Sequence, residues 1–157
     1  MDRQIIERYV AGGQQLRDSV EGLSREDLIA RPGPGLWSIQ EVVIHLTDSD
    51  SISIDRMKRM VIEDNPPLLY ADETAYVERL ATHEQSIEDA LTLFEVGRRQ
   101  FGRVLRNLPD EAFARYGTHN KRGVVALGDM VEDYIEHLEY HLKFRDFSLI
   151  PTGVRSP

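Results

Sequence analysis

The amino-acid sequence predicts an all-α protein, a four-helix bundle with short connecting helices. Four long segments place apolar residues at steps of three and four, the period of a helix with one buried face. Proline and glycine clusters separate these segments, and no segment shows a convincing strand pattern. Because amphipathic helices bury their apolar faces most simply against one another, a bundle is the economical architecture.

We expect one domain over residues 1–157, since a chain of this length buries a substantial core without disulfides. The chain contains no cysteine, which excludes a disulfide scaffold, a thiolate metal site and a protein-borne thiol nucleophile. A thiol that reacts here would therefore arrive with a substrate.

The formal net charge of −8, from 27 acidic and 19 basic residues, argues against a nucleic-acid partner. The arginines are scattered apart from Arg98-Arg99, a pair that either an exposed helix face or an anionic substrate would explain. Residues 1–8 are charged, unlike a signal peptide, and no later segment is apolar for long enough to span a bilayer. These features predict a soluble cytoplasmic protein without a membrane partner.

The first predicted helix covers about residues 2–20, where Gly12-Gly13 either weakens it or lets a neighbouring helix come close. A short helix capped by Ser24 follows, and the segment 31–35, Arg-Pro-Gly-Pro-Gly, ends regular structure.

The second long helix has a well-defined predicted start. Ser38 is the N-cap, Glu41 completes a capping box, and Trp37 with Val42 forms a hydrophobic staple. The helix should run to about Ile62, with its apolar face toward the core.

The middle of the chain is expected to leave this helix at residues 65–67, Asn-Pro-Pro, and to form a loop with a short helical turn over 72–80. A third long helix is predicted from about Thr82, with Thr82 and Gln85 as a second capping box, and Pro109 opens a short turn after it.

The last predicted helix follows a connector at 116–123 and runs to about Phe147. Steps of three and four along one face give the buried seam of a bundle helix, which consists of Leu127, Met130, Tyr134, His137, His141 and Phe144.

His137 and His141 stand four residues apart, so on a helix both project from one face, about 40° apart around the axis. Two buried imidazoles need polar partners, and one metal ion would serve both. A solvated helix face or a hydrogen-bonded core histidine is the alternative reading. The zinc-protease pattern His-Glu-x-x-His does not fit, because Leu138 occupies the position of the catalytic glutamate.

A catalytic metal site of this kind needs a third protein ligand and one open position. His45 is the best candidate because it lies at the edge of the apolar stripe of the second long helix. His83 lies near a predicted helix start and His119 in the connector, so both are weaker candidates. A core histidine bonded to a neighbouring side chain remains the alternative for His45.

Two runs together carry a family resemblance: Trp37-Ser-Ile-Gln-Glu-Val-Val-Ile-His45-Leu-Thr-Asp48, and much later His137-Leu-Glu-Tyr-His141. In order and spacing the chain, from about residue 28 to 144, resembles the DinB/YfiT-like superfamily. The resemblance implies a DinB-type bundle, often a homodimer, with a divalent metal held by His45, His137 and His141.

The same resemblance implies several activities, including bacillithiol and mycothiol S-transferases, thiol-dependent maleylpyruvate isomerase and metal-dependent hydrolases. We expect an enzyme for a small-molecule substrate, with zinc or nickel as the metal. Transfer of a low-molecular-weight thiol cosubstrate comes first and hydrolysis second. A non-catalytic metal-binding or stress-related bundle is the remaining alternative.

Two further residues are predicted near the metal. Asp48, three residues after His45, could accept a hydrogen bond from the imidazole nitrogen that does not face the ion. Tyr134 could present its hydroxyl to a bound group, although core packing also explains it. Asp133 is a second possible acceptor, and for both aspartates a solvated or salt-bridged carboxylate is the alternative. Glu41 is accounted for by its capping box.

Overall fold

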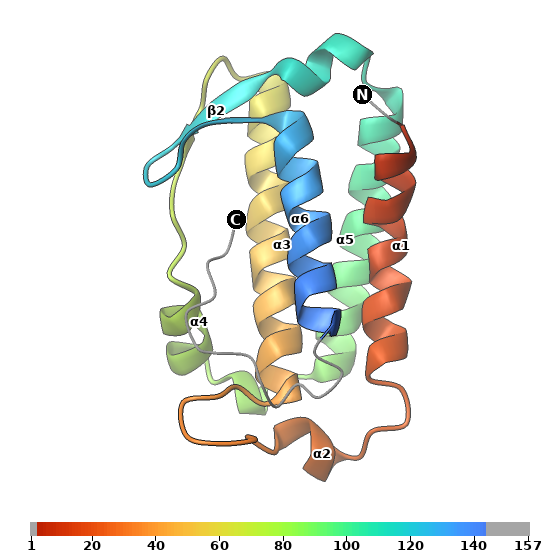
Figure 1. Cartoon of the computed structure of the whole chain (residues 1–157), viewed down its shortest axis with the longest axis vertical. Coiled ribbons are helices and arrows are strands. Elements are labelled where there is room, and N and C mark those ends of the chain that lie inside the picture. Colours follow the sequence, from red (N-terminus) through yellow and green to blue (C-terminus); the bar gives the residue numbers. More distant parts are fainter. Residues whose placement is uncertain (1–2, 144–157) are drawn as a thin grey trace.

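Four long helices form the bundle in a computed structural model, which describes residues 3–143. They are α1 (Gln4–Ser19), α3 (Ile39–Ile62), α5 (Ile87–Asn107) and α6 (Leu127–Lys143). Figure 1 shows α1 and α6 running in one direction and α3 and α5 in the other. Helices α1 and α3 each contact both α5 and α6, so α1 and α3 occupy diagonal corners. The predicted four-helix bundle is confirmed; the predicted helix end near Phe147 lies outside the described residues.

The predicted start of α3 is present in the structure. Ser38 Oγ accepts a hydrogen bond from the Glu41 backbone N–H at 3.2 Å, and Glu41 Oε2 accepts one from the Ser38 N–H at 2.8 Å. The short helix α2 (Arg25–Ile29) begins in the same way, with Ser24 and Asp27 as the two partners. These caps satisfy N–H groups that the first turn of a helix leaves without partners.

The predicted start of the third long helix at Thr82 is wrong. Residues Thr82–Glu84 form a single 3₁₀ turn, η1, and α5 begins only at Ile87, where Ser86 Oγ accepts from the Asp89 N–H at 3.1 Å. The Thr82 hydroxyl is buried and donates back to the carbonyl of Val77 at 3.3 Å. It is therefore engaged with the preceding helix and does not cap the following one.

A small sheet, which the sequence did not predict, closes one end of the bundle. It consists of β1 (Pro67–Leu68), β2 (Tyr116–His119) and β3 (Gly123–Ala126), with β1 parallel and β3 antiparallel to β2. Strands of two to four residues are too short to show an alternating pattern. The 3₁₀ helix η2 (Asp110–Ala114) leads from α5 into the sheet.

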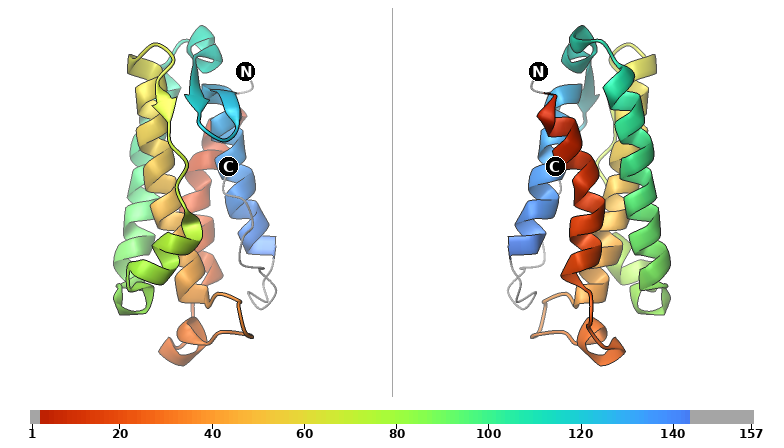
Figure 2. Two further views of the ribbon diagram at one scale, coloured as in Figure 1. Left: turned by 90° about the vertical axis from the view of Figure 1, so that its left-hand side faces the viewer. Right: turned by 90° about the vertical axis from the view of Figure 1, so that its right-hand side faces the viewer.

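Because α3 and α5 point the same way, the chain between them must return along the whole bundle. This crossover, residues 63–86, contains β1, α4 (Glu73–Arg79) and η1. Asp72 caps α4 by accepting from the Ala75 N–H at 3.1 Å. Figure 2 shows the crossover lying along α3, and this path brings α4 against the N-terminal half of that helix, where Glu73 approaches His45.

Close helix packing depends on Gly12 in α1. A Cβ atom there would lie 2.7 Å from Leu138 Cδ2 of α6 and would also collide with the Arg98 guanidinium of α5. Of the two roles predicted for this glycine, close approach of neighbouring helices is the one observed.

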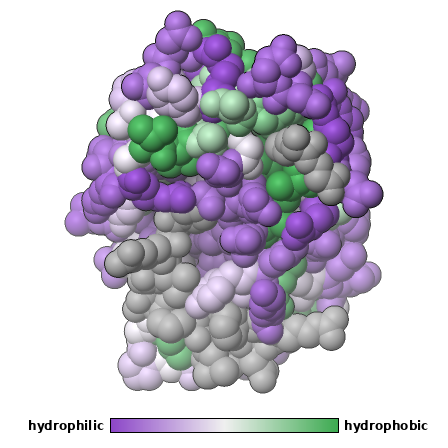
Figure 3. All heavy atoms as spheres, turned by 45° about the horizontal axis from the view of Figure 1, so that its top comes forward, coloured by the Kyte–Doolittle hydropathy of each residue, from purple (hydrophilic) through white to green (hydrophobic). Residues whose placement is uncertain are grey.

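The surface view in Figure 3 shows a largely hydrophilic end of the bundle with small apolar groups. Single exposed apolar side chains are usual on soluble proteins. Within residues 3–143 no helix combines the length and apolar character needed to cross a bilayer.

Candidate metal centre

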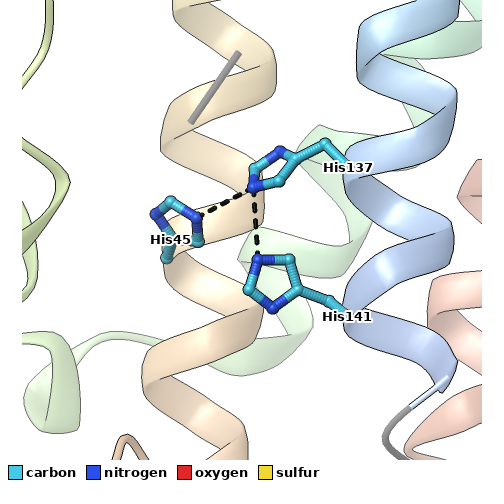
Figure 4. Close-up of side chains that lie close together, drawn as sticks. All are labelled: His45, His137 and His141. Carbon is cyan, nitrogen blue, oxygen red and sulfur yellow. Dashed lines mark hydrogen bonds between the residues drawn. The ribbon is translucent and has the colours of Figure 1, made fainter. Parts of the chain in front are cut away.

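Three histidines from two helices meet inside the bundle. His45 comes from α3, and His137 and His141 come from successive turns of α6. The Nε2 atom of His137 lies 3.2 Å from that of His45 and 3.2 Å from that of His141. Each of the three rings offers one nitrogen such that these nitrogens lie within 4.8 Å of one another. Figure 4 shows the three rings pointing toward a common centre.

The surrounding structure holds these rings in place. Each of the three side chains is almost wholly buried, with exposed fractions of 3%, 6% and 1% for His45, His137 and His141. The indole of Trp37 packs against the His45 ring, with centroids 5.1 Å apart. Because Trp37 directly precedes the capping box, the start of α3 and the position of His45 two turns later are determined together.

Burial also determines the charge of the rings. It lowers the pKa of His45 to about 3, with a further contribution from the charge of His141. Burial lowers the pKa of His141 to about 4 and holds the pKa of His137 well below its ordinary value, where the other two histidines add to the effect. All three imidazoles are therefore neutral at neutral pH, the form that binds metal ions.

The site fits a divalent cation. A tetrahedral ion with Zn–N distances of about 2.0–2.1 Å separates its nitrogen ligands by about 3.3 Å, close to the two distances found here. The other ring nitrogen of His141, Nδ1, is buried and has no hydrogen-bond partner among the described residues. Three convergent neutral imidazoles suit zinc, nickel and several other transition metals.

Glu73 is a further acidic residue at this centre that sequence reasoning missed. It lies in the first turn of α4, is 9% exposed, and its Oε2 atom lies 3.8 Å from His45 Nε2. Nothing in the sequence signals this approach, because it depends on the path of the crossover past α3.

A pocket opens beside His45. Its empty volume is about 370 Å³, which includes the part open to solvent. It is lined by His45, Asp48, Ser49, Ile52, Arg56, Tyr70, Ala71, Glu73, Tyr76, His119 and Tyr134.

Both additional residues predicted near the metal, Asp48 and Tyr134, line this pocket. Asp48 Oδ2 is buried and has no hydrogen-bond partner among the described residues, and burial raises the pKa of this carboxyl group. The hydroxyl of Tyr134 accepts from Arg56 Nη1 at 3.4 Å, and its ring contacts the His137 ring edge-on, with centroids 6.0 Å apart. Their roles toward a bound ion stay predictions.

Other candidate residues are engaged elsewhere. Asp133 pairs with Arg122 at 2.8 Å, which is the salt-bridged alternative for this carboxylate. His83 is 38% exposed and bonds to Ser38 at the start of α3.

The two adjacent arginines of α5 also have partners. Arg98 is buried and bound to Asp50, so it does not lie on an exposed helix face. Arg99 is exposed and pairs with Glu95 of the same helix. Neither lines the pocket.

Comparison with known proteins places the chain in a family. Residues 8–144 match the family model described as the DinB superfamily. The chain belongs to the DinB superfamily. Among relatives of this DinB protein, a proposed metal-dependent hydrolase of Oceanobacillus iheyensis is 29% identical over 127 residues, covering 81% of this chain and 73% of the relative. YfiT of Bacillus subtilis, also a proposed metal-dependent hydrolase, is 26% identical over 140 residues, covering 88% and 77%.

Solved structures show the same fold. The structure of Bacillus subtilis YfiT, described as having an unusual four-helix bundle topology, superposes with a TM-score of 0.86 at 24% identity, over 92% of the DinB chain and 84% of YfiT. A mycothiol-dependent maleylpyruvate isomerase superposes with a TM-score of 0.71 at 11% identity, over 98% of this chain and 63% of the isomerase.

Proposed function

We propose that this DinB protein is a divalent-metal-dependent hydrolase of small molecules, with zinc or nickel held by His45, His137 and His141. The observation that carries the proposal is the Glu73 carboxylate, which lies 3.8 Å from His45 Nε2 and lines the same pocket. Several curated relatives are proposed metal-dependent hydrolases, which supports hydrolysis over the other reactions of the superfamily.

A divalent ion bound here would lower the pKa of a water molecule toward neutrality and polarise a substrate carbonyl group. The three imidazoles are neutral, so they leave the full charge of the ion available. Glu73 Oε2 is placed to take up the proton that the nucleophile loses and to return it to the leaving group. Burial raises the pKa of Tyr134, so its hydroxyl stays protonated and can donate to a substrate oxygen.

Thiol transfer is the second candidate. The chain has no cysteine, so the thiol would be a low-molecular-weight cosubstrate, and a structural neighbour is mycothiol-dependent. Glu73 could take up a thiol proton as readily as one from water, so the site geometry supports both reactions. A purely structural metal site is less well supported, because a pocket that opens to solvent lies beside His45.

The test compares Glu73→Gln with Glu78→Gln, an exposed glutamate of the same helix, in zinc-loaded protein. The substrates are a panel of small esters and amides, each with and without a low-molecular-weight thiol and an electrophile. We expect kcat to fall about 10²-fold to 10⁴-fold in Glu73→Gln only, with zinc content unchanged. If turnover requires the thiol, the proposed reaction is S-transfer and not hydrolysis. Equal activity of both variants would refute the role of Glu73.

We also propose that the protein acts as a homodimer, as the family resemblance implies. Light scattering coupled to gel filtration measures the molar mass, and a value near the 18.0 kDa of one chain would contradict this proposal. The cytoplasmic location stays a prediction.

A further inference from the structure

Arg56 places a buried positive charge in the wall of the pocket. Its side chain is 6% exposed, and it reaches the Tyr134 hydroxyl through Nη1 and the Leu69 carbonyl through Nη2. Among residues 3–143, its buried Nε–H has no hydrogen-bond partner and no carboxylate forms an ion pair with its guanidinium. A buried guanidinium without a counter-ion is costly, so this arrangement calls for an anion.

His119 offers a hydrogen-bond donor to the same pocket. Its Nδ1 atom accepts from the backbone N–H groups of Lys121 at 3.1 Å and of Arg122 at 3.2 Å. The ring proton must therefore sit on Nε2, which makes that atom a donor. The side chain is 3% exposed and lines the pocket. In the sheet, His119 of β2 pairs with Leu68 of β1. The next residue along the chain, Leu69, binds Arg56 through its carbonyl group.

The charges in the pocket are separated along its length. The carboxyl groups lie toward His45: Glu73 approaches that ring directly, and Asp48 is less than one helical turn away on α3. The cations lie toward the sheet, where the Lys121 ammonium sits 3.4 Å from the centre of the Tyr70 ring. Burial lowers the pKa of His119, and the charges of Arg56, Arg122 and Lys121 lower it further. The sheet end of the pocket is thus electropositive.

The two ends of the pocket follow the course of α3. Arg56 lies three helical turns beyond His45 on α3, about 16 Å along the axis. Long side chains on a helix lean back toward its N-terminus, so the guanidinium reaches toward the histidines. Arg56 and His45 line the same pocket, so a ligand held at Arg56 can extend along the pocket toward His45.

We propose that Arg56 and His119 form an anion-binding subsite for a carboxylate group of the substrate, with the reacting bond at the His45 end of the pocket. This inference rests on the proposed function and narrows its substrate class to small carboxylic acids that carry a hydrolysable group. The planar guanidinium matches a carboxylate in shape and charge, and the imidazole N–H adds one further donor.

The test measures equilibrium binding to the zinc-loaded full-length protein by calorimetry, so it does not depend on turnover. The probe is succinate, with the uncharged diamide succinamide as its matched neutral analogue. We expect saturable binding of succinate, and none of succinamide at the same concentrations. Binding of both probes with similar affinity would overturn the subsite, because the charge of the ligand would then be irrelevant.

Variants assign the binding to these two side chains. Arg56→Gln is compared with Arg59→Gln, which removes the same charge from the same helix at a surface position paired with Glu63. We expect succinate binding to weaken about tenfold or more in Arg56→Gln and to stay unchanged in Arg59→Gln. Equal affinities of these two variants would refute the proposal.

A second variant covers the case in which Arg56→Gln does not fold. In His119→Asn the new side-chain oxygen can still accept from the loop N–H groups, while the Nε2–H donor is lost. We expect several-fold weaker succinate binding, and unchanged affinity would count against the subsite.

Loss of hydrolysis in Glu73→Gln with intact succinate binding would support both the hydrolase proposal and the anion-binding subsite. Succinate binding without any hydrolytic activity would remove only the proposed function.

Discussion

Asp50 and Arg98 form an ion pair in the interior of the bundle. Asp50 Oδ1 accepts from Arg98 Nε at 3.0 Å and from Nη2 at 2.8 Å, and their side chains are 2% and 1% exposed. Arg98 Nη2 also donates to the Tyr134 carbonyl at 2.8 Å. The guanidinium lies over the rings of Tyr9 and Phe94, 4.6 Å and 4.4 Å from their centres. Arg98 thus joins α3 to α6, the two helices that carry the histidines.

The first prediction concerns this ion pair. Arg98→Met should lower the free energy of unfolding by about 3–5 kcal/mol, because it leaves the Asp50 carboxylate buried without a counter-ion. The adjacent Arg99 is exposed and pairs only with Glu95 among the described residues, so Arg99→Met should change the stability by less than about 0.5 kcal/mol. Urea denaturation of both variants measures the difference. Similar losses in the two would show that the pair does not stabilise the bundle.

The second prediction concerns metal content. The purified protein should carry about one zinc or nickel ion per chain, and His141→Ala should lose it while its circular dichroism spectrum remains helical. His83→Ala serves as the control, since His83 lies outside the three-histidine cluster and is 38% exposed. Elemental analysis gives the answer: equal metal in wild type and His141→Ala would rule out this centre.

The third prediction is a pH dependence of stability at the start of α3. Burial by itself raises the pKa of Glu41, but hydrogen bonds from Arg31 and Ser38 outweigh it and hold the pKa below its ordinary value of 4.5. Ionised Glu41 therefore stabilises the fold fully above pH 4.5, and this contribution disappears as the pH falls through the lower folded pKa.

Glu41→Gln keeps an acceptor for the Ser38 N–H and removes the charge that faces Arg31. Because Arg31 is half exposed, we expect a loss of only about 1 kcal/mol at pH 7. Below pH 4.5, urea titrations should show a smaller difference in the free energy of unfolding between Glu41→Gln and wild type. If this difference stays constant down to the pH of acid unfolding, ionisation of Glu41 is not its cause.

The fourth prediction concerns Gly12. Alanine normally favours a helix over glycine, yet Gly12→Ala should destabilise the protein by about 1–3 kcal/mol, because its methyl group would displace Leu138 and Arg98. Gln15→Ala, at an exposed position of α1, should be neutral or slightly stabilising. Thermal unfolding of the two variants compares them, and a rise in Tm for Gly12→Ala would disprove close packing at this position.

Local sequence signals predicted the features that depend on neighbouring residues. The Ser38–Glu41 capping box needs only four consecutive residues, and the approach of His137 to His141 needs only one helical turn. The predicted start of α5 was wrong although Thr82 and Gln85 have the right spacing for a capping box. The Thr82 hydroxyl instead donates back to the carbonyl of Val77 in α4, and Ser86 caps α5.

The sequence by itself determined the four helices and the placement of two imidazoles on one helix face, and it made His45 the best candidate for a third. That His45 meets the other two rings was decided by the tertiary structure. Helical periodicity and capping are local, so they can be read directly from residue order. Only the tertiary structure decided that Glu73 lies beside His45, that Arg98 is buried against Asp50, and that Arg56 and His119 share a pocket. These contacts join residues far apart in the chain, and the crossover path and helix packing that create them leave no periodic trace in the sequence.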